Sequence, residues 1–280
     1  MLSYRHAFHA GNFADVLKHW VLIECLEYLK QKEKPFVYYD THSGPGMYAL
    51  DSDYAQKNQE FKTGISLLWD QADLPKGLLQ YCDCIRTQNP DDTLRHYPGS
   101  PSIAQALMRE WDRLTLCELH RTEHEILSGQ FAHDKRSEVW NEDGLNRTLK
   151  LLPPRERRGI VLIDPSYEMK EDYERVVEFL QAAHRKFAQG VYLLWYPVVE
   201  RERIDRLEAA LINSGIRNIT LFELGIQADT EARGMTSSGM IVINPPWTLK
   251  QSIDDGLDYL AKKLEVDGFS TLRSEVLVGE

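Results

Sequence analysis

The sequence predicts an α/β protein built on a doubly wound, mostly parallel sheet. Apolar runs of strand length alternate along the chain with segments of helical periodicity, which is the pattern of that architecture. Polar residues and glycines follow several of the runs, at the positions where parallel sheets bind ligands. The last two runs have no helix-length segment between them, so we expect them to pair antiparallel. Together these observations indicate a mixed sheet with a ligand crevice at its carboxyl edge.

Seven apolar runs are assigned as strands. In chain order they are residues 36–40, 114–118, 137–140, 159–163, 191–196, 218–223 and 239–243. Four segments with helical spacing follow or separate them, namely residues 100–111, 172–187, 200–214 and 249–264. Another helix near the N-terminus carries Asp15, Lys18 and His19. Seven strands with an antiparallel last pair form the outline of the Rossmann-like methyltransferase fold.

One gap between these elements is too long for a simple connection. Residues 51–95 separate the glycine-containing loop after the first strand from the helix that should follow it. Apolar positions in this gap have helical spacing over two short segments, around 61–69 and 78–81. We therefore expect a small helical insertion at 51–95, with residues 1–50 and 96–280 forming the main domain.

Composition excludes several classes of protein. The chain has 280 residues, no apolar run near the ~20 residues of a transmembrane helix, and no signal-peptide core after Met1. We therefore expect a cytoplasmic protein with no membrane partner. Its four cysteines lack the paired spacing of a zinc site, and no metal is predicted. A net charge of −10 argues against a protein that coats nucleic acid electrostatically, but leaves room for a local basic surface.

Three features at successive strand ends suit S-adenosylmethionine. Asp40-Thr-His-Ser-Gly-Pro-Gly46 lacks the dinucleotide and nucleoside-triphosphate signatures, yet its glycines allow close backbone contact with an aminoacyl group. Glu118 lies where a ribose diol is held, and Asp143-Gly144 lies where an adenine amino group is recognised. Each feature alone is also an ordinary turn or a solvated strand end. Their order along the chain favours a methyltransferase.

The fourth strand leads into Asp164-Pro165-Ser166-Tyr167, a variant of the Asp/Asn-Pro-Pro-Tyr motif of amine methyltransferases. The exocyclic amine of a nucleobase is a poor nucleophile because its lone pair is delocalised into the ring. A carboxylate and a backbone carbonyl that accept its N–H bonds favour the pyramidal, nucleophilic form, and an aromatic ring can stack the base. We therefore predict Asp164, Pro165 and Tyr167 as catalytic residues. Alone, such a tetrapeptide is mostly an Asx-Pro turn after a strand.

Asn244-Pro245-Pro246-Trp247 spells the same motif more faithfully. It ends the seventh strand, which we expect at the antiparallel edge, with its carboxyl end directed away from the ligand crevice. We therefore interpret it as a structural turn.

The N-terminal segment combines aromatic and cationic residues in a pattern that suits single-stranded nucleic acid. Its alternative is a frayed tail before an amphipathic helix. Tyr4-Arg-His6, Phe8-His-Ala-Gly-Asn12 and Ala14-Asp-Val-Leu-Lys-His19 resemble the RlmJ-type 23S ribosomal RNA adenine-N6 methyltransferases. The resemblance spans nearly the whole chain and continues through 40–42, 97–101, 164–165, 196–198, 234–236 and 239–247.

The resemblance implies a monomeric Rossmann-like enzyme with a helical insertion and an N-terminal segment that contacts substrate and cofactor. It implies S-adenosylmethionine contacts at His19, His42, Ser100, Glu118, Asp143, Gly144 and Asp164. It also implies that Tyr4 touches the RNA and that His6 and Lys18 lie near the active site. The chain departs from the family pattern at Ser166, where a second proline is expected, which bears on base positioning and rate.

The sequence therefore predicts methyl transfer from S-adenosylmethionine to N6 of an unpaired or flipped adenine in 23S rRNA, either protein-free or in an early assembly intermediate. One alternative is a DNA adenine-N6 methyltransferase, which would use the same residues. The other is a non-catalytic nucleic-acid-binding protein on a methyltransferase fold, with Ser166 as the mark of lost activity. Net acidity disfavours the first, and the complete series of cofactor residues disfavours the second.

Overall fold

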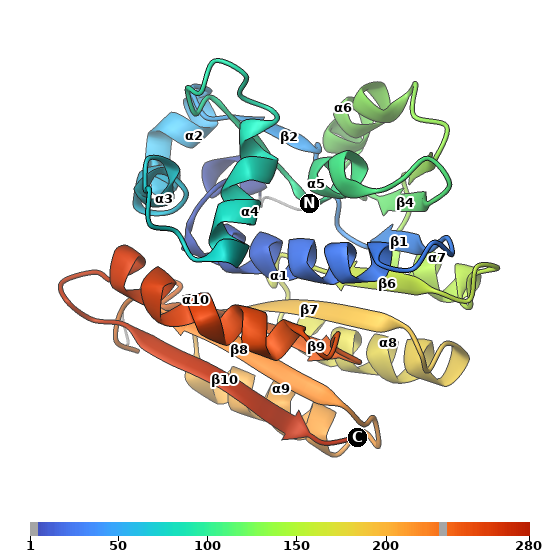
Figure 1. Ribbon diagram of the computed structural model, residues 1–280. Coiled ribbons are helices and arrows are strands. Elements are labelled where there is room, and N and C mark those ends of the chain that lie inside the picture. Colours follow the sequence, from blue (N-terminus) through green and yellow to red (C-terminus); the bar gives the residue numbers. More distant parts are fainter. Residues whose placement is uncertain (1–4, 230–233) are drawn as a thin grey trace.

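An eight-stranded sheet forms the centre of the molecule (Figure 1), with strand order β10-β8-β9-β7-β6-β1-β4-β5. The structure is a computed structural model that describes residues 5–229 and 234–280. The strands are β1 (Val37–Asp40), β4 (Arg113–Cys117), β5 (Ser137–Trp140), β6 (Gly159–Ile163), β7 (Val191–Val198), β8 (Ile219–Gly225), β9 (Ser237–Ile243) and β10 (Thr271–Val278).

The sheet is mixed, as predicted. Strands β5, β4, β1, β6 and β7 are parallel, whereas β9 runs antiparallel to both β7 and β8. Two expectations were wrong. The sheet has an eighth strand, β10, which pairs antiparallel with β8. Strand β9 lies between β7 and β8, and therefore inside the sheet and not at its edge. The direction of β9, on which the interpretation of Asn244–Trp247 depends, is as predicted.

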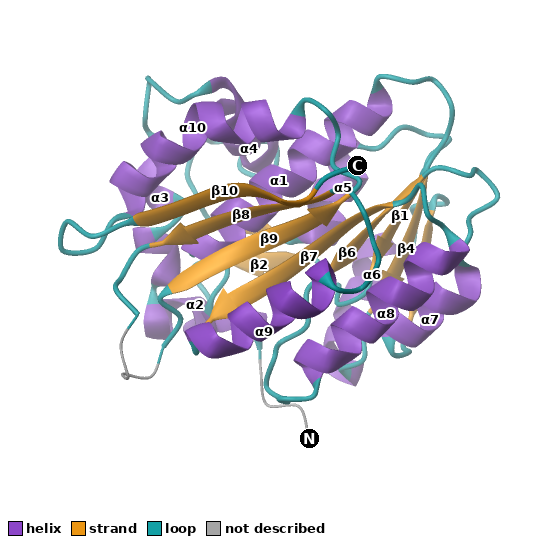
Figure 2. Cartoon of the chain, turned by 90° about the horizontal axis from the view of Figure 1, so that it is seen from below, coloured by secondary structure: helices purple, strands orange, loops and turns teal. Residues whose placement is uncertain are grey.

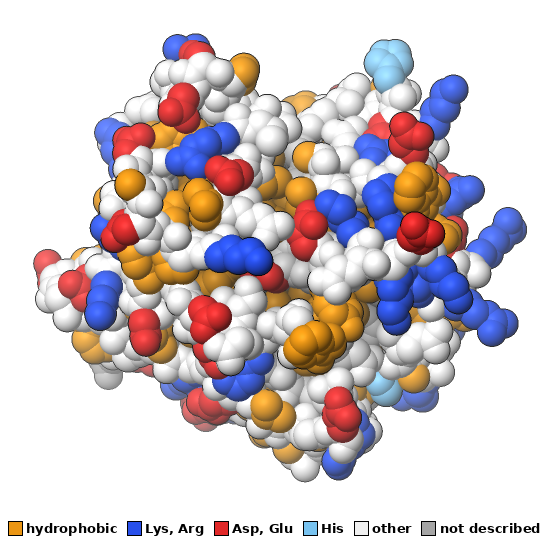
Figure 3. Space-filling view, in the orientation of Figure 1, with side chains coloured by type: hydrophobic (Ala, Val, Ile, Leu, Met, Phe, Trp, Pro, Cys, Tyr) orange, Lys and Arg blue, Asp and Glu red, His pale blue; other side chains and the backbone are white. Residues whose placement is uncertain are grey.

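Helices cover both faces of the sheet (Figure 2). One face carries α1 (Phe13–Lys30), α5 (Ser100–Leu107) and α10 (Leu249–Leu264), and the other carries α7 (Gly144–Leu151), α8 (Asp172–Lys186) and α9 (Arg201–Ile212). Helix α6 (Arg121–Phe131) packs beside β5. No helix in the described ranges is long and apolar enough to cross a membrane. Charged side chains of both signs are scattered over the face in Figure 3.

Side chains alternate along β1 between the two faces, as a strand requires. Phe36 and Tyr38 join the hydrophobic cluster under α1, whereas Val37 and Tyr39 join the cluster under α8 and α9. The central strands are therefore buried on both sides, which explains why they are continuous apolar runs in the sequence.

The long gap after β1 contains short helices. Strand β2 (Met47–Ala49) pairs antiparallel with β3 (His96–Pro98) and joins the two ends of the segment. Between them lie α2 (Asp53–Asn58), the 3-10 turn η2 (Glu60–Thr63), α3 (Ser66–Trp69) and α4 (Lys76–Arg86). Their apolar side chains share one cluster with α1 and α5. The division of the chain into a main domain and an insertion at 51–95 stays a prediction.

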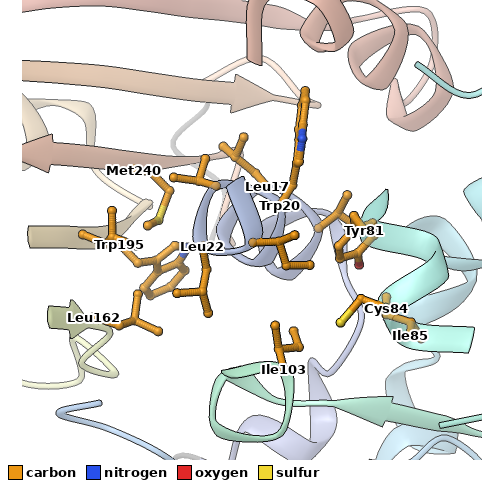
Figure 4. Close-up of a cluster of buried hydrophobic side chains, with 14 of the residues drawn as sticks. Leu17, Trp20, Leu22, Tyr81, Cys84, Ile85, Ile103, Leu162, Trp195 and Met240 are labelled. Carbon is orange, nitrogen blue, oxygen red and sulfur yellow. The ribbon is translucent and has the colours of Figure 1, made fainter. Parts of the chain in front are cut away.

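Helix α1 lies between the sheet and the helices of this segment. Fourteen of its 18 residues are buried. Leu162, Trp195 and Met240 contact it from the sheet side, and α4 and α5 cover its other side (Figure 4). A helix that is buried all round is expected to be apolar all round. The exceptions, Asp15, Lys18 and His19, are buried as well and must therefore find polar partners.

Trp20 packs α1 against α4 and α10, and its replacement should destabilise the fold. Its side chain is fully buried against Gly77 of α4 and Gly256 of α10, where an added Cβ would come within 2.5 and 2.9 Å of the indole. Trp20→Ala should lower the free energy of unfolding by about 3–5 kcal/mol, because it leaves a large cavity. The matched control is Trp247→Ala, since Trp247 is 81% exposed and should cost less than about 0.5 kcal/mol. If urea denaturation shows that the two variants lose the same free energy of unfolding, the packing role assigned to Trp20 is wrong.

Candidate active site

A cavity of about 190 Å³ opens at the carboxyl ends of β6, β1, β4 and β5. Ligand crevices of doubly wound sheets form there, at the point where successive crossovers leave a strand in opposite directions. Here β4 lies on one side of β1 and β6 on the other. Seven of the predicted site residues line the cavity: His6, His42, Glu118, Asp143, Gly144, Asp164 and Pro165.

The loop after β1 is held from inside the protein by Asp40. Its Oδ2 accepts hydrogen bonds from the hydroxyls of Tyr38 (2.6 Å) and Ser100 (2.7 Å), and its Oδ1 accepts one from the His42 backbone N–H. Complete burial raises the pKa of Asp40 to about 6. Ser100 is itself buried and does not line the cavity. Asp40 and Ser100 therefore shape the loop that borders the cavity.

Glu118 follows β4 and joins two backbone segments. Its Oε2 accepts a hydrogen bond from the N–H of Gly44 (2.8 Å), and its Oε1 accepts one from the N–H of His120 (2.6 Å). Gly44 has a φ of 61°, a conformation that glycine adopts without strain. Burial raises the pKa of Glu118 to about 7, although both hydrogen bonds favour its charged form. This carboxylate is placed to bind a polar ligand group at the cavity wall.

Asp143 and Gly144 begin α7 at the cavity. The Asp143 side chain caps the helix by accepting a hydrogen bond from the Asn146 N–H (2.9 Å), and it forms an ion pair with Arg175 (2.7 Å). These contacts outweigh its burial and lower the pKa of Asp143. A Cβ at Gly144 would lie 2.0 Å from the carbonyl oxygen of Thr41, so only glycine lets the two loops meet. The cavity floor depends on this close approach.

Asp164 belongs to a buried polar network with α1. The Lys18 ammonium lies 2.7 Å from Asp164 Oδ2 and 2.8 Å from Asp15 Oδ1. Asp15 Oδ2 in turn is 2.8 Å from His6 Nε2 and accepts a hydrogen bond from the Gly11 N–H (2.9 Å). Lys18 thus links the helix to the end of β6, and Asp15 holds Lys18 and His6 together.

Charge within this network opposes the cost of burial. Burial raises the pKa of Asp164, and the neighbouring Lys18 and His6 act against that rise. Burial alone would lower the pKa of Lys18, but the charges of Asp15 and Asp164 raise it instead. The pKa of Asp15 lies well below its usual range because His6 and Lys18 outweigh its burial. The ammonium is therefore charged, and it favours the carboxylate form of Asp164.

Four predicted residues lie outside the cavity lining. Lys18 reaches the site through Asp164, as described above. His19 is buried, with Nδ1 2.7 Å from the Tyr97 hydroxyl, and burial lowers its pKa to about 3. Tyr167 donates a hydrogen bond to the Trp195 carbonyl (2.7 Å), and its ring packs on Tyr173 with centroids 4.5 Å apart. The fourth is Ser100. Tyr4 lies outside the described residues.

His42, by contrast, lines the cavity with a neutral ring, because burial lowers its pKa to about 4. Its Nδ1 lies 2.8 Å from the Thr41 hydroxyl, which donates a hydrogen bond to the Leu162 carbonyl (3.0 Å). A neutral imidazole can donate and accept hydrogen bonds without adding charge to the site.

Asn244 lies near the amino ends of the parallel strands, at the end of the sheet opposite the cavity. Its side-chain amide donates hydrogen bonds to the carbonyls of Ala188 (2.7 Å) and Gly190 (2.8 Å), which precede β7. The backbone of Asn244 is left-handed, with a φ of 54°. Asn244–Trp247 therefore lies away from the cavity, as the predicted direction of β9 requires, and its interpretation as a structural turn is consistent with these contacts.

Sequence analysis missed several residues of the site. Tyr48, His120, Glu123, Met169, Asp172 and Arg175 line the cavity but belong to no recognisable motif. The ion pair between Asp15 and Lys18 could have been predicted from the sequence, because an aspartate three residues before a lysine on one helix indicates such a pair. Nothing in the sequence links Arg175 to Asp143, because 32 residues separate them.

The fold and the cavity define a Rossmann-like methyltransferase. A family model described as ribosomal RNA large subunit methyltransferase D, RlmJ, matches residues 33–275. Ribosomal RNA large subunit methyltransferase J of Escherichia coli is 49% identical, over 94% of each chain. The Haemophilus influenzae protein of that name is 48% identical over the full length of both chains. The chain therefore belongs to the RlmJ family.

A solved structure supports the same fold. The crystal structure of a Legionella pneumophila protein has a TM-score of 0.89 and 39% identity, covering 96% of this chain and 98% of the other.

Glu118 should make stability depend on pH in a definite direction. Its folded-state pKa of about 7 lies above the ordinary value of 4.5, so its contribution to stability is fully present below pH 4.5 and is lost as the pH rises through 7. We therefore compare the free energy of unfolding of Glu118→Gln with that of wild type at two pH values. The difference should favour the variant more at pH 8 than at pH 5, by roughly 2 kcal/mol. The control is Glu125→Gln, at an exposed carboxylate. A pH-independent difference in chemical denaturation for Glu118→Gln would refute the burial argument.

Proposed function

We propose that this protein methylates N6 of an adenine in 23S rRNA, with S-adenosylmethionine as the methyl donor. The observation that carries the proposal is the Asp164 carboxylate at the cavity wall, held by Lys18 from a helix 146 residues earlier in the chain. Membership of the RlmJ family supports the ribosomal substrate.

The residues that line the cavity fit the donor. The carboxyl group of Glu118 would accept hydrogen bonds from a ribose diol, Asp143 would accept one from an adenine amino group, and Gly144 lets the loop that carries Asp143 approach Thr41 closely at the cavity. When bound, S-adenosylmethionine supplies an electrophilic methyl group on a sulfonium. His42 would add a neutral hydrogen-bonding group near its aminoacyl end. Ser100 and His19 would act from behind the cavity wall, since both are buried.

Asp164 would orient the amine of the target adenine. Lys18 occupies its Oδ2, whereas Oδ1 has no hydrogen-bond partner among the described residues and so can accept an amine N–H. The Pro165 carbonyl would accept the second N–H. Held in this way, the nitrogen lone pair is directed at the methyl group and withdrawn from conjugation with the ring. Asp164 then accepts the proton that the nitrogen loses after transfer.

The remaining contacts concern the RNA. His6 lines the cavity beside Tyr48, with ring centroids 5.3 Å apart, and would approach the target nucleotide together with Tyr4. Tyr167 would stack the base only after its ring leaves Trp195, so base stacking requires local rearrangement. The protein would act as a monomer in the cytoplasm, on protein-free rRNA or on an early assembly intermediate.

One experiment tests the substrate directly. Methyl transfer from labelled S-adenosylmethionine should be measured on protein-free 23S rRNA, assembled large subunits and duplex DNA in parallel. Label in N6-methyladenine of protein-free rRNA is the expected result. Label confined to DNA would favour a DNA methyltransferase. No binding of S-adenosylmethionine by calorimetry would favour a non-catalytic protein.

Asp164→Ala should lower methyl transfer by about 10²- to 10⁴-fold, because it removes both the acceptor for the amine and the final proton acceptor. Cofactor binding should survive at least in part, since Glu118 and Asp143 are untouched. Single-turnover transfer and calorimetric titration of S-adenosylmethionine measure the two effects separately. Glu168→Gln, at an exposed position four residues away, is the control. Near-normal turnover in Asp164→Ala would remove Asp164 from the mechanism.

Asp15 should act as a positioning residue through Lys18 and His6. Asp15→Asn weakens the hold on both groups but leaves Lys18 paired with Asp164, so the fold should persist. We expect kcat to fall by about 10- to 100-fold while the affinity for S-adenosylmethionine stays within about threefold. Lys18→Met combined with Asp15→Asn should be clearly non-additive in kcat, because both changes act on one unit. Additive losses, or a parallel loss of cofactor affinity, would indicate a merely structural role.

A further inference from the structure

A group of basic residues lies at the amino ends of the parallel strands, at the edge of the sheet opposite the cavity. It contains Lys32, Lys34, Lys135, Arg155 and Arg157, all of them exposed. In Figure 3, Lys and Arg side chains gather at the right-hand end of the molecule, where α1 finishes in Figure 1. We call the five cations, with the exposed Trp111, the amino-edge patch.

Register brings the loops of this patch together. Val37, at the start of β1, pairs with Arg113 of β4 on one side and with Gly159 of β6 on the other. The loops that precede these strands, 31–36, 109–112 and 152–158, are therefore neighbours. Lys135 precedes β5, the next strand along the sheet.

Three other arginines hold these loops in place. Arg109 donates hydrogen bonds to the carbonyls of Lys30, Lys32 and Lys34, and it forms an ion pair with Asp112 (2.8 Å). Arg158 donates to the carbonyls of Leu29 and Lys34, which fastens the 152–158 loop to the end of α1. Arg136 donates to Gln105 and Met108 and pairs with Asp134. These three have structural roles and are not counted in the patch.

The five cations of the patch have no such role. Their side chains make no hydrogen bond or ion pair with another residue in the ranges 5–229 and 234–280. Cations stabilise helix C-termini, but only within the last turn. Lys32 and Lys34 lie beyond α1, Lys135 lies beyond α6, and the two arginines lie beyond α7. Helix stability therefore does not explain them.

Local charge at this edge is opposite to that of the whole protein. The nearby carboxylates of Asp112, Asp134 and Glu156 face Arg109, Arg136 and Arg113, respectively. Glu33 and Glu110 are the exposed acidic side chains in the same loops, against five exposed cations without partners. A positive patch on a chain of net charge −10 concentrates attraction for anions at one place.

An aromatic side chain gives the patch a second feature of RNA-binding surfaces. Trp111 is 55% exposed, and the Arg109 guanidinium lies 5.2 Å from its ring centroid. Aromatic and cationic side chains side by side suit unpaired bases and their phosphates.

We propose that the amino-edge patch binds a second segment of the substrate RNA, remote from the adenine in the cavity. The inference rests on the proposed function and adds to it a substrate requirement. The patch and the cavity lie at opposite ends of the parallel strands, so only an RNA that extends around the molecule can occupy both. The protein thereby distinguishes a large folded rRNA from a short fragment with the same target sequence.

The test uses a charge-removing variant, K32Q/K34Q/K135Q/R155Q, in the full-length protein. Arg157 is left unchanged because its φ of 54° makes substitution there a backbone change as well. The control variant, K62Q/K76Q/R206Q/K262Q, removes the same charge from exposed positions elsewhere. An rRNA fragment that the wild-type protein methylates is shortened stepwise to the shortest length that is still methylated.

On the shortest RNA, the patch variant should match wild type within about twofold in kcat/KM. On the long RNA, its kcat/KM should fall about tenfold or more, and the slope of log K against log salt should decrease by about two to four, one phosphate contact per cation. Unchanged long-RNA binding and kcat/KM, or an equal loss in the control variant, would overturn the inference.

Binding and its salt dependence report on the patch even if no RNA is methylated, and failure of the proposed function is then distinguishable from failure of the patch. Anionic phosphatidylserine vesicles provide a competing occupant. If wild-type protein binds such vesicles and the patch variant does not, while both bind long RNA equally, the patch is not an RNA site.

Discussion

The ion pair between Lys18 and Asp164 joins helix α1 to the end of strand β6, and the geometry of the candidate active site depends on it. Asp164 ends the central strand β6, and Lys18 belongs to a helix buried between the sheet and the helices of the 51–95 segment. Taking two charges out of water is costly unless each is paired and hydrogen-bonded. Lys18 meets this condition only when α1 is fully seated, because its partners lie on two different elements. The packing of α1 and the geometry of the carboxylate therefore depend on each other.

Packing around α1 explains why this coupling holds. Trp20 and its neighbours fix the helix against α4 and α10, and Gly77 and Gly256 leave space for the indole. The same helix carries Asp15, which reaches forward to Lys18 and back to His6. A shift of α1 would consequently move Asp15, Lys18 and the N-terminal segment that carries His6 together. The opposite wall of the cavity is fixed separately, by the contact of Gly144 with Thr41 and by the Asp143–Arg175 pair.

Much of this arrangement was predictable from sequence, for physical reasons. The central strands are buried on both faces and are continuous apolar runs, and the residues at their carboxyl ends must converge on one edge. That argument located Glu118, Asp143 and Asp164, and the direction of β9 separated Asn244 from the site. Strand β10 was missed because it is a half-exposed strand beyond the last helix, where polar and apolar residues mix. Arg175 and Tyr48 were missed because long-range contacts alone bring them to the cavity.

The two edges of the sheet are put to different chemical uses, and topology makes this possible. Carboxyl ends of parallel strands gather short loops around a ligand, whereas the amino ends gather the ends of the preceding helices and their connections. Selection for ligand chemistry at one edge therefore leaves the other edge free to vary in charge. In this chain, three arginines donate hydrogen bonds to carbonyls at that edge, and the five cations of the amino-edge patch have no hydrogen-bond or ion-pair partner within the described chain. An acidic protein that must act on a polyanion gains most from placing its positive charge there, because the cavity already carries several carboxylates whose ionisation further cations would alter.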